Sequence, residues 1–216
     1  MSFSSEPQQN RDNQNPLVLQ IKSLQAWGMP NAVDLSLNRQ QIWMVSGASG
    51  TGKSQFLKAL ADLIEHSGLV ELYGQEQNQM CPEKWRSQVM YFSAETAWWR
   101  DHVAEHFDTQ PDTEILNSVG LKPSILEKNP DDLSSGEKQR LALLRGLQYR
   151  PKVLLLDEIT ANLDPKSAQL VERLVVDYIN TNQTCALWIS HDEEQQQRLS
   201  CENCQLVFVA KEEGRS

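Results

Sequence analysis

A glycine-rich segment with the sequence GASGTGKS carries residue types that could bind phosphate groups. It matches the pattern glycine, four residues, glycine, lysine, serine, in which the glycines let the backbone fold tightly with its N–H groups facing inward. Lys53 would place a positive charge near the β- and γ-phosphates of a nucleotide, and Ser54 would offer a hydroxyl to Mg²⁺. The pattern predicts nucleotide binding, and the alternative is a glycine turn followed by a surface lysine. The predicted phosphate-binding residues are Gly47, Ala48, Ser49, Gly50, Thr51, Gly52, Lys53 and Ser54.

Two adjacent carboxylates follow a second apolar run later in the chain. Residues 153–156 (VLLL) are typical of a parallel strand buried on both faces, and Asp157 and Glu158 come directly after it. Beside a triphosphate, Asp157 would hold Mg²⁺ and Glu158 would activate a water molecule. The alternative is a solvated acidic loop.

A third segment, LSSGEKQR at residues 133–140, precedes a helical stretch. Small residues such as Ser134 and Gly136 at the start of a helix favour a second anion site, because the first backbone N–H groups of a helix point outward. One nucleotide cannot easily occupy both this site and the glycine loop. The sequence therefore raises the question of what the second site binds.

Predicted strands and helices alternate along the chain, which indicates an α/β fold with a mainly parallel sheet. A short strand leads into the glycine loop, and a helix with an apolar stripe follows it, as a phosphate loop requires. The segment from about residue 95 to 150 is predicted to be a helical lobe inserted into the sheet domain. Strands are expected at residues 17–22, 33–37, 42–46, 69–73, 89–93, 153–156, 184–190 and 205–210, and helices at 54–65 and 165–180.

Composition narrows the class of protein. Hydrophobic residues make up 39% and charged residues 23% of the 216 residues, which is ordinary for a globular domain. The net charge of −9 argues against a nucleic-acid partner, since such proteins usually carry a basic patch. Residues 1–16 are predicted to be a disordered tail, with one domain over residues 17–216 and a cytoplasmic location.

Four cysteines, Cys81, Cys185, Cys201 and Cys204, are expected to be free thiols in a reducing compartment. Cys201 and Cys204 form a single C-x-x-C pair. A metal or redox role is the alternative, although no second ligand pair stands at a suitable spacing.

Together these motifs resemble those of the ATP-binding cassette (ABC) ATPases over residues 17–210. The third segment looks like the family's signature, usually Leu-Ser-Gly-Gly-Gln, although Ser135 and Glu137 depart from it. The resemblance implies a P-loop NTPase fold with a mainly parallel sheet, an antiparallel β part and an inserted α-helical subdomain. It also implies ATP and Mg²⁺ as cofactors and a homodimer in which Ser134 and Gly136 cap the γ-phosphate on the partner. A separate transmembrane permease would hold the protein at the inner face of the membrane.

The same resemblance assigns further residues. Asp164 would contact the partner, His191 would sense the γ-phosphate, and Trp27 would stack on adenine. The family's Mg²⁺-contacting glutamine is replaced by Ala94, so Glu95 next to it is the candidate metal ligand. For Trp27 the alternative is a core or surface tryptophan.

Trp98 and Trp99 lie where related ATPases dock a helix of the permease, and the alternative is packing inside the helical lobe. Within the family, the strings KVLLLDEIT and LWISHD are similar to those of bacterial iron-export ATP-binding subunits. Two other functions remain open at this point: a soluble ABC-type switch not coupled to transport, and a small-molecule kinase with a phosphate loop.

Overall fold

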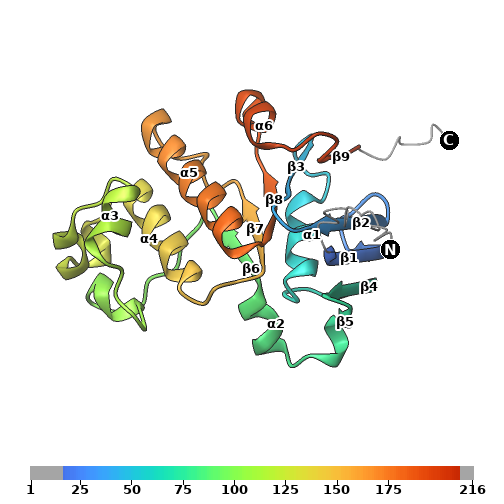
Figure 1. The fold of residues 1–216 in the computed structure, drawn as a ribbon, viewed down its shortest axis with the longest axis horizontal. Coiled ribbons are helices and arrows are strands. Elements are labelled where there is room, and N and C mark those ends of the chain that lie inside the picture. The colour runs from blue at the N-terminus through green and yellow to red at the C-terminus, as the bar shows by residue number, and fades with distance from the viewer. Residues whose placement is uncertain (1–16, 210–216) are drawn as a thin grey trace, which may run out of the picture.

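The computed structural model describes residues 17–209, in which the strands form two sheets (Figure 1). The smaller sheet has four antiparallel strands in the order β2-β1-β4-β5. The larger sheet has five parallel strands in the order β6-β7-β8-β3-β9. The strands are β1 (Leu17–Ala26), β2 (Val33–Asn38), β3 (Ile42–Gly47), β4 (His66–Leu72), β5 (Gln75–Glu76), β6 (Val89–Ser93), β7 (Val153–Asp157), β8 (Cys185–Ile189) and β9 (Gln205–Phe208). The prediction of an α/β fold with a mainly parallel sheet is therefore confirmed.

Helices cover both faces of the parallel sheet, as the apolar composition of its central strands requires. Strands β7 and β8 are buried along their whole length, so each face must pack against another layer. The helix after the glycine loop, α1, shares one core with the antiparallel sheet, whereas α4 and α5 pack on the opposite face. The helices are α1 (Lys53–Leu60), α2 (Pro82–Gln88), α3 (Thr113–Ser118), α4 (Ser135–Leu147), α5 (Pro165–Asn182) and α6 (Glu193–Leu199).

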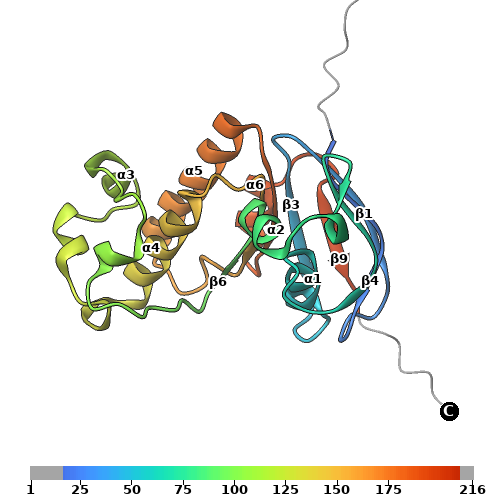
Figure 2. The ribbon, with the colours of Figure 1, turned by 90° about the horizontal axis from the view of Figure 1, so that it is seen from below.

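The residues between β6 and β7 form a region with its own core, at the end of the molecule away from the antiparallel sheet (Figures 1 and 2). It contains α3 and α4 and three short 3-10 turns: η2 (Val103–His106), η3 (Pro123–Glu127) and η4 (Pro130–Asp132). Another 3-10 turn, η1 (Gln77–Gln79), precedes α2. Proline begins η3 and η4, because its fixed φ suits the first helical position.

The strand register explains how motifs that are far apart in the sequence meet. Ser93, Asp157 and Ile189 lie side by side at the ends of β6, β7 and β8, and Ile189 pairs in turn with Val45 on β3. All four strands run in the same direction, so the loops that follow them emerge at one edge of the sheet. This edge is where ligands bind in open α/β folds.

Some predicted boundaries were wrong. The helix expected at 54–65 ends at Leu60, and Leu63, within the expected range, is 49% exposed. Asp62 there has a left-handed φ of 58°, which ends the helix. Helices α2 and α6 were not predicted. The tail prediction for residues 1–16 lies outside the described residues. Between residues 17 and 209, no helix is both long and apolar enough to cross a membrane.

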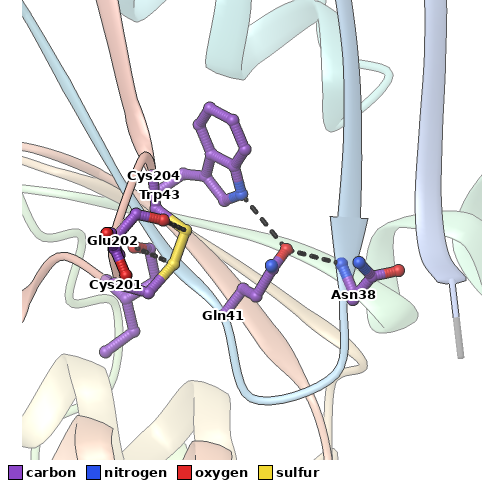
Figure 3. Close-up of a disulfide and its surroundings, with 7 residues drawn as sticks. Asn38, Gln41, Trp43, Cys201, Glu202 and Cys204 are labelled. Carbon is purple, nitrogen blue, oxygen red and sulfur yellow. Dashed lines mark hydrogen bonds between the residues drawn. A yellow bond between two sulfur atoms is a disulfide. The ribbon is translucent and has the colours of Figure 1, made fainter. Parts of the chain in front are cut away.

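The prediction of four free thiols was also wrong, because Cys201 and Cys204 form a disulfide in the loop from α6 to β9 (Figure 3). The loop is a tight turn in which the Cys204 N–H donates to the Cys201 carbonyl at 3.0 Å. This turn places the two Cα atoms 5.1 Å apart, within the range that a disulfide spans. Cys81 and Cys185 are free, the first exposed and the second buried.

Candidate functional site

The glycine loop connects β3 to α1, and two of its glycines are required by close backbone contacts. Gly47 has a φ of 133° and Gly52 a φ of 88°, both in the region that side chains disfavour. A Cβ at Gly47 would collide with the carbonyl oxygen of Phe208, and one at Gly52 would lie 2.5 Å from that of Gly28. The loop is therefore held tightly between β9 and the turn after β1.

Lys53 is only 6% exposed, and its ammonium group lies over the loop. Its Nζ donates to the carbonyl oxygens of Gly47 at 2.8 Å and Ala48 at 2.9 Å. Thr51 Oγ1 donates to the same Ala48 oxygen at 2.8 Å. A fixed positive charge thus stands beside the N-terminus of α1, where the helix dipole also favours an anion.

A pocket of about 350 Å³ brings together residues from four separate parts of the chain. It lies beside the glycine loop, and Trp27, Glu158 and His191 also line it. Trp27 is 86% exposed, so its ring is free to stack on a flat ligand such as a base. The lining residues are Trp27, Gly28, Ser49, Gly50, Gly52, Lys53, Ser54, Gln55, Glu158 and His191.

The two predicted carboxylates at the end of β7 have different environments. Asp157 is 8% exposed, and its Oδ2 accepts a hydrogen bond of 2.6 Å from the hydroxyl of Tyr91. Glu158 has a left-handed φ of 53°, which turns the chain sharply at the end of the strand. Its Oε1 lies 3.0 Å from Nε2 of His191. Asp157, a buried acid suited to a metal, is therefore followed directly by Glu158, a more exposed acid paired with a histidine.

Ser134 caps the N-terminus of α4 in a reciprocal capping box. Its Oγ accepts from the Glu137 N–H at 3.2 Å, and the Glu137 carboxylate accepts from the Ser134 N–H at 2.9 Å and from its hydroxyl at 2.8 Å. The Ser134 N–H bond holds the pKa of Glu137 below its ordinary value. The glutamate that departs from the usual signature thus stabilises the start of the helix. Ser134 and Gly136 are not among the residues that the structure places around the loop pocket.

Comparison with known proteins decides the family. Residues 30–161, more than half of the chain, match the family described as ABC transporter. The chain belongs to the ABC transporter ATPase family. This ABC ATPase is accordingly an ATP-binding protein and an ATP hydrolase.

Individual relatives of this ABC ATPase carry different names. It is 37% identical over 177 residues to the "Probable iron export ATP-binding protein FetA" of Escherichia coli (strain K12), covering 76% of this chain and 79% of that protein. It is 32% identical over 181 residues to the "Lipoprotein-releasing system ATP-binding protein LolD" of Hahella chejuensis, covering 74% and 77%. It is 31% identical over 188 residues to "Phosphonates import ATP-binding protein PhnC 1" of Rhodopseudomonas palustris, covering 74% and 68%. The cargo in these names varies, while the ATP-binding subunit is common to all three.

Glu95 does not line the loop pocket of this ABC ATPase. It lines a groove of about 560 Å³ between the segment after β6 and helix α4. Trp98 is half-buried and packs on the helical core, whereas Trp99 is 64% exposed and lines the same groove as Glu95. Arg145 near the end of α4 links the two tryptophans, since its guanidinium lies 4.6 Å and 4.9 Å from their ring centres.

Tyr91 and Gln139 have structural roles in the ABC ATPase that the sequence did not reveal. Tyr91 of β6 bonds Asp157 directly. Gln139 of α4 is buried, and its Nε2 donates to the carbonyl of Ser93 at 2.9 Å. The pairing of β6 with β7 is the signal that would have placed Tyr91 beside Asp157, and that pairing cannot be read from one sequence.

Proposed function

We propose that this ABC ATPase is the ATP-binding and hydrolysing subunit of a membrane transporter, working as a homodimer with two ATP molecules at its interface. The observation that carries the proposal is the separation of two anion-binding elements within one chain. The glycine loop opens on the pocket with Glu158 and His191, whereas Ser134 heads α4 at an exposed position outside that pocket. A second copy arranged head to tail would supply its Ser134 and Gly136 to the nucleotide on the first loop.

Residues of the loop pocket fit a Mg²⁺–ATP complex. Lys53 would neutralise charge on the β- and γ-phosphates, and Trp27 would stack on the adenine. Ser54 in the pocket and Asp157, which precedes the pocket residue Glu158, offer oxygens of the kind that Mg²⁺ prefers. The Tyr91 hydroxyl bonds Oδ2 of Asp157, so Oδ1 is the proposed ligand atom. Glu95 is the third proposed ligand, and the segment after Ser93 would have to rearrange for it to reach this site. The ion would offset charge on the phosphates during transfer.

Glu158 and His191 are the proposed hydrolytic pair. Glu158 would orient and polarise the attacking water, and His191 would contact the γ-phosphate. In support of this pairing, both side chains line the loop pocket and Glu158 Oε1 lies 3.0 Å from His191 Nε2. Asp164, which caps α5 through bonds to the N–H groups of Lys166 and Ser167, is proposed to contact the partner cassette.

The groove with Trp99 is the proposed docking site for the permease, and it would hold the protein at the inner, cytoplasmic face of the membrane. The carboxylates of Glu95, Glu105 and Asp108 line it together with the exposed indole of Trp99, and Arg100 and Arg145 line it as well. An amphipathic helix with apolar residues and charges of both signs would suit this lining. We treat residues 17–216 as one ABC domain with a helical subdomain at about 95–150. Iron export as the transport reaction rests on the similarity to FetA alone.

The central test measures ATP hydrolysis per protomer against protein concentration. A shared site predicts that the specific activity rises with concentration and then saturates as dimers form. A specific activity that stays constant over about a hundredfold dilution while the protein remains monomeric would rule out the composite site. Co-expression with a candidate multi-span permease, followed by transport assays in vesicles loaded with Fe²⁺, tests the permease and the cargo separately.

A further inference from the structure

A buried polar network joins three segments close to the proposed hydrolytic pair. Gln195 of α6 is 1% exposed, and its Nε2 donates to Thr160 Oγ1 at 3.1 Å and to Glu172 Oε1 at 2.9 Å. Thr160 lies in the turn after β7, and Glu172 lies on α5. The amide of Gln195 therefore connects its own helix, α6, to that turn and to α5.

Glu172 anchors this network. Its carboxylate is 6% exposed and accepts from Arg198 Nε at 3.1 Å and from Arg198 Nη2 at 3.0 Å, in addition to Gln195. A buried carboxylate is stable only when its oxygens are paired, so Glu172 requires donors such as the buried Gln195 amide and the Arg198 guanidinium, whose side chain is 46% exposed. The network is well connected, and such networks make a rigid part of a core.

Gln195 also fixes the start of its own helix. Its backbone N–H donates to Asp192 Oδ1 at 3.0 Å, and Asp192 directly follows His191. Through its side chain the same residue holds Thr160, which lies two positions after Glu158. One residue thus ties the segment of His191 to the turn of Glu158.

Glu158 and His191 themselves are not held by burial. Their side chains are 38% and 53% exposed, and a contact between exposed side chains is weak and easily separated. The pair lines one pocket of about 550 Å³ with Thr160, Glu172 and Gln195. The backbones of the two segments are joined by the bond from the Glu158 N–H to the Ile189 carbonyl at 3.2 Å, and the network of Gln195 adds a second connection between them through side chains.

We propose that Gln195 is a positioning residue for ATP hydrolysis, acting through Thr160 and Glu172 to keep Glu158 and His191 in register. The proposal rests on the hydrolytic roles proposed above for that pair. Displacement of a reacting group by about 1 Å can cost as much as about a hundredfold in rate, so a positioning residue outside the site can control turnover.

The test replaces Gln195 by methionine, which keeps the side-chain length but removes both hydrogen-bonding groups. We expect kcat to fall about tenfold while KM for ATP changes less than about twofold, because the glycine loop is untouched. Gln197→Met is the matched control, since Gln197 is exposed on the same helix. A kcat for Gln195→Met within about twofold of the control would overturn the proposal.

Two further comparisons separate positioning from a general loss of stability. In a His191→Ala background, Gln195→Met should cause a smaller loss of kcat than in the unmodified protein, because residues that act as a unit are not additive. A full additional loss would overturn the proposal, whereas a His191→Ala variant with normal turnover would overturn the proposed role of the histidine instead. If Gln195→Met does not fold, Thr160→Val should lower kcat and Thr160→Ser, which keeps the hydroxyl, should restore it. Equal kcat for these two variants would also refute the positioning role.

Discussion

The phenol of Tyr91 donates a hydrogen bond of 2.6 Å to Oδ2 of Asp157, from β6 to the end of the neighbouring strand β7. Burial, together with this bond, raises the pKa of Tyr91 well above its ordinary value, so the phenol stays protonated and remains a donor at neutral pH. The bond therefore holds the Asp157 carboxylate in one orientation, with Oδ1 directed away from Tyr91. The bond is the kind of outer contact that orients a metal ligand.

Replacing Tyr91 by phenylalanine should weaken Mg²⁺ binding. Loss of an outer-shell partner commonly costs about 10- to 100-fold in metal affinity, so the Mg²⁺ concentration for half-maximal ATP hydrolysis should rise by about tenfold or more. Tyr178→Phe is the control, because its phenol bonds the Pro151 carbonyl at 3.0 Å, away from Asp157. An unchanged Mg²⁺ dependence in Tyr91→Phe would show that Asp157 does not need this partner.

Glu158→Gln should keep ATP binding but lower turnover by about a hundredfold or more, as expected when the group that polarises water is lost. The side chain remains the same size and can still reach His191, so the loss would be chemical rather than structural. The measurement is ATP affinity by equilibrium binding together with steady-state hydrolysis. Near-normal hydrolysis in this variant would remove Glu158 from the proposed mechanism.

Much of the fold could be predicted from the sequence, because the relevant signals are local. The apolar run before Asp157 indicated a buried strand, and the glycine pattern before Lys53 indicated a strand, loop and helix in that order. Both are confirmed. The meeting of these segments at one edge also follows from their shared strand direction.

What could not be predicted depends on contacts between distant segments. Gln195 and Glu172 look like ordinary surface residues of polar helices, and only the packing of α6 against α5 makes them a buried pair. The position of Glu95 in the groove beside α4 depends on how the helical region packs. The disulfide depended on the turn geometry at Cys201, which the spacing alone does not determine.

A mixed-dimer experiment tests whether Ser134 acts in trans. Ser134→Arg places a bulky cation at the exposed start of α4, where the proposed partner nucleotide would lie. In a dimer with one mutant chain, we expect the site on the unmodified chain's own glycine loop to fail, because the arginine comes from the other copy. Ser118→Arg, at an exposed position on α3, is the control. Full activity at both sites of the Ser134→Arg heterodimer would exclude the composite arrangement.

Alkaline pH should destabilise the fold through groups buried in their neutral form. Complete burial raises the pKa of the Cys185 thiol above its ordinary 9.0, so in the folded state the thiol stays neutral while in the unfolded chain it ionises near that value. The stability it contributes is therefore present below about pH 9 and is lost as pH rises further, at a slope of up to about 1.4 kcal/mol per pH unit. Burial also raises the pKa of Tyr178, so this group adds a further loss of folding stability as pH rises above its ordinary pKa of 10.0.

The measurement is the free energy of unfolding in urea at about pH 8 and about pH 10, where the linkage relation predicts a decrease. Cys185→Ala should be less stable than the unmodified protein at the lower pH, since it removes buried sulfur, but its stability should fall less between the two. Cys81→Ala, at an exposed position, serves as the matched control. If Cys185→Ala loses as much stability with rising pH as the Cys81 control does, ionisation of the buried thiol is not the cause of the alkaline transition.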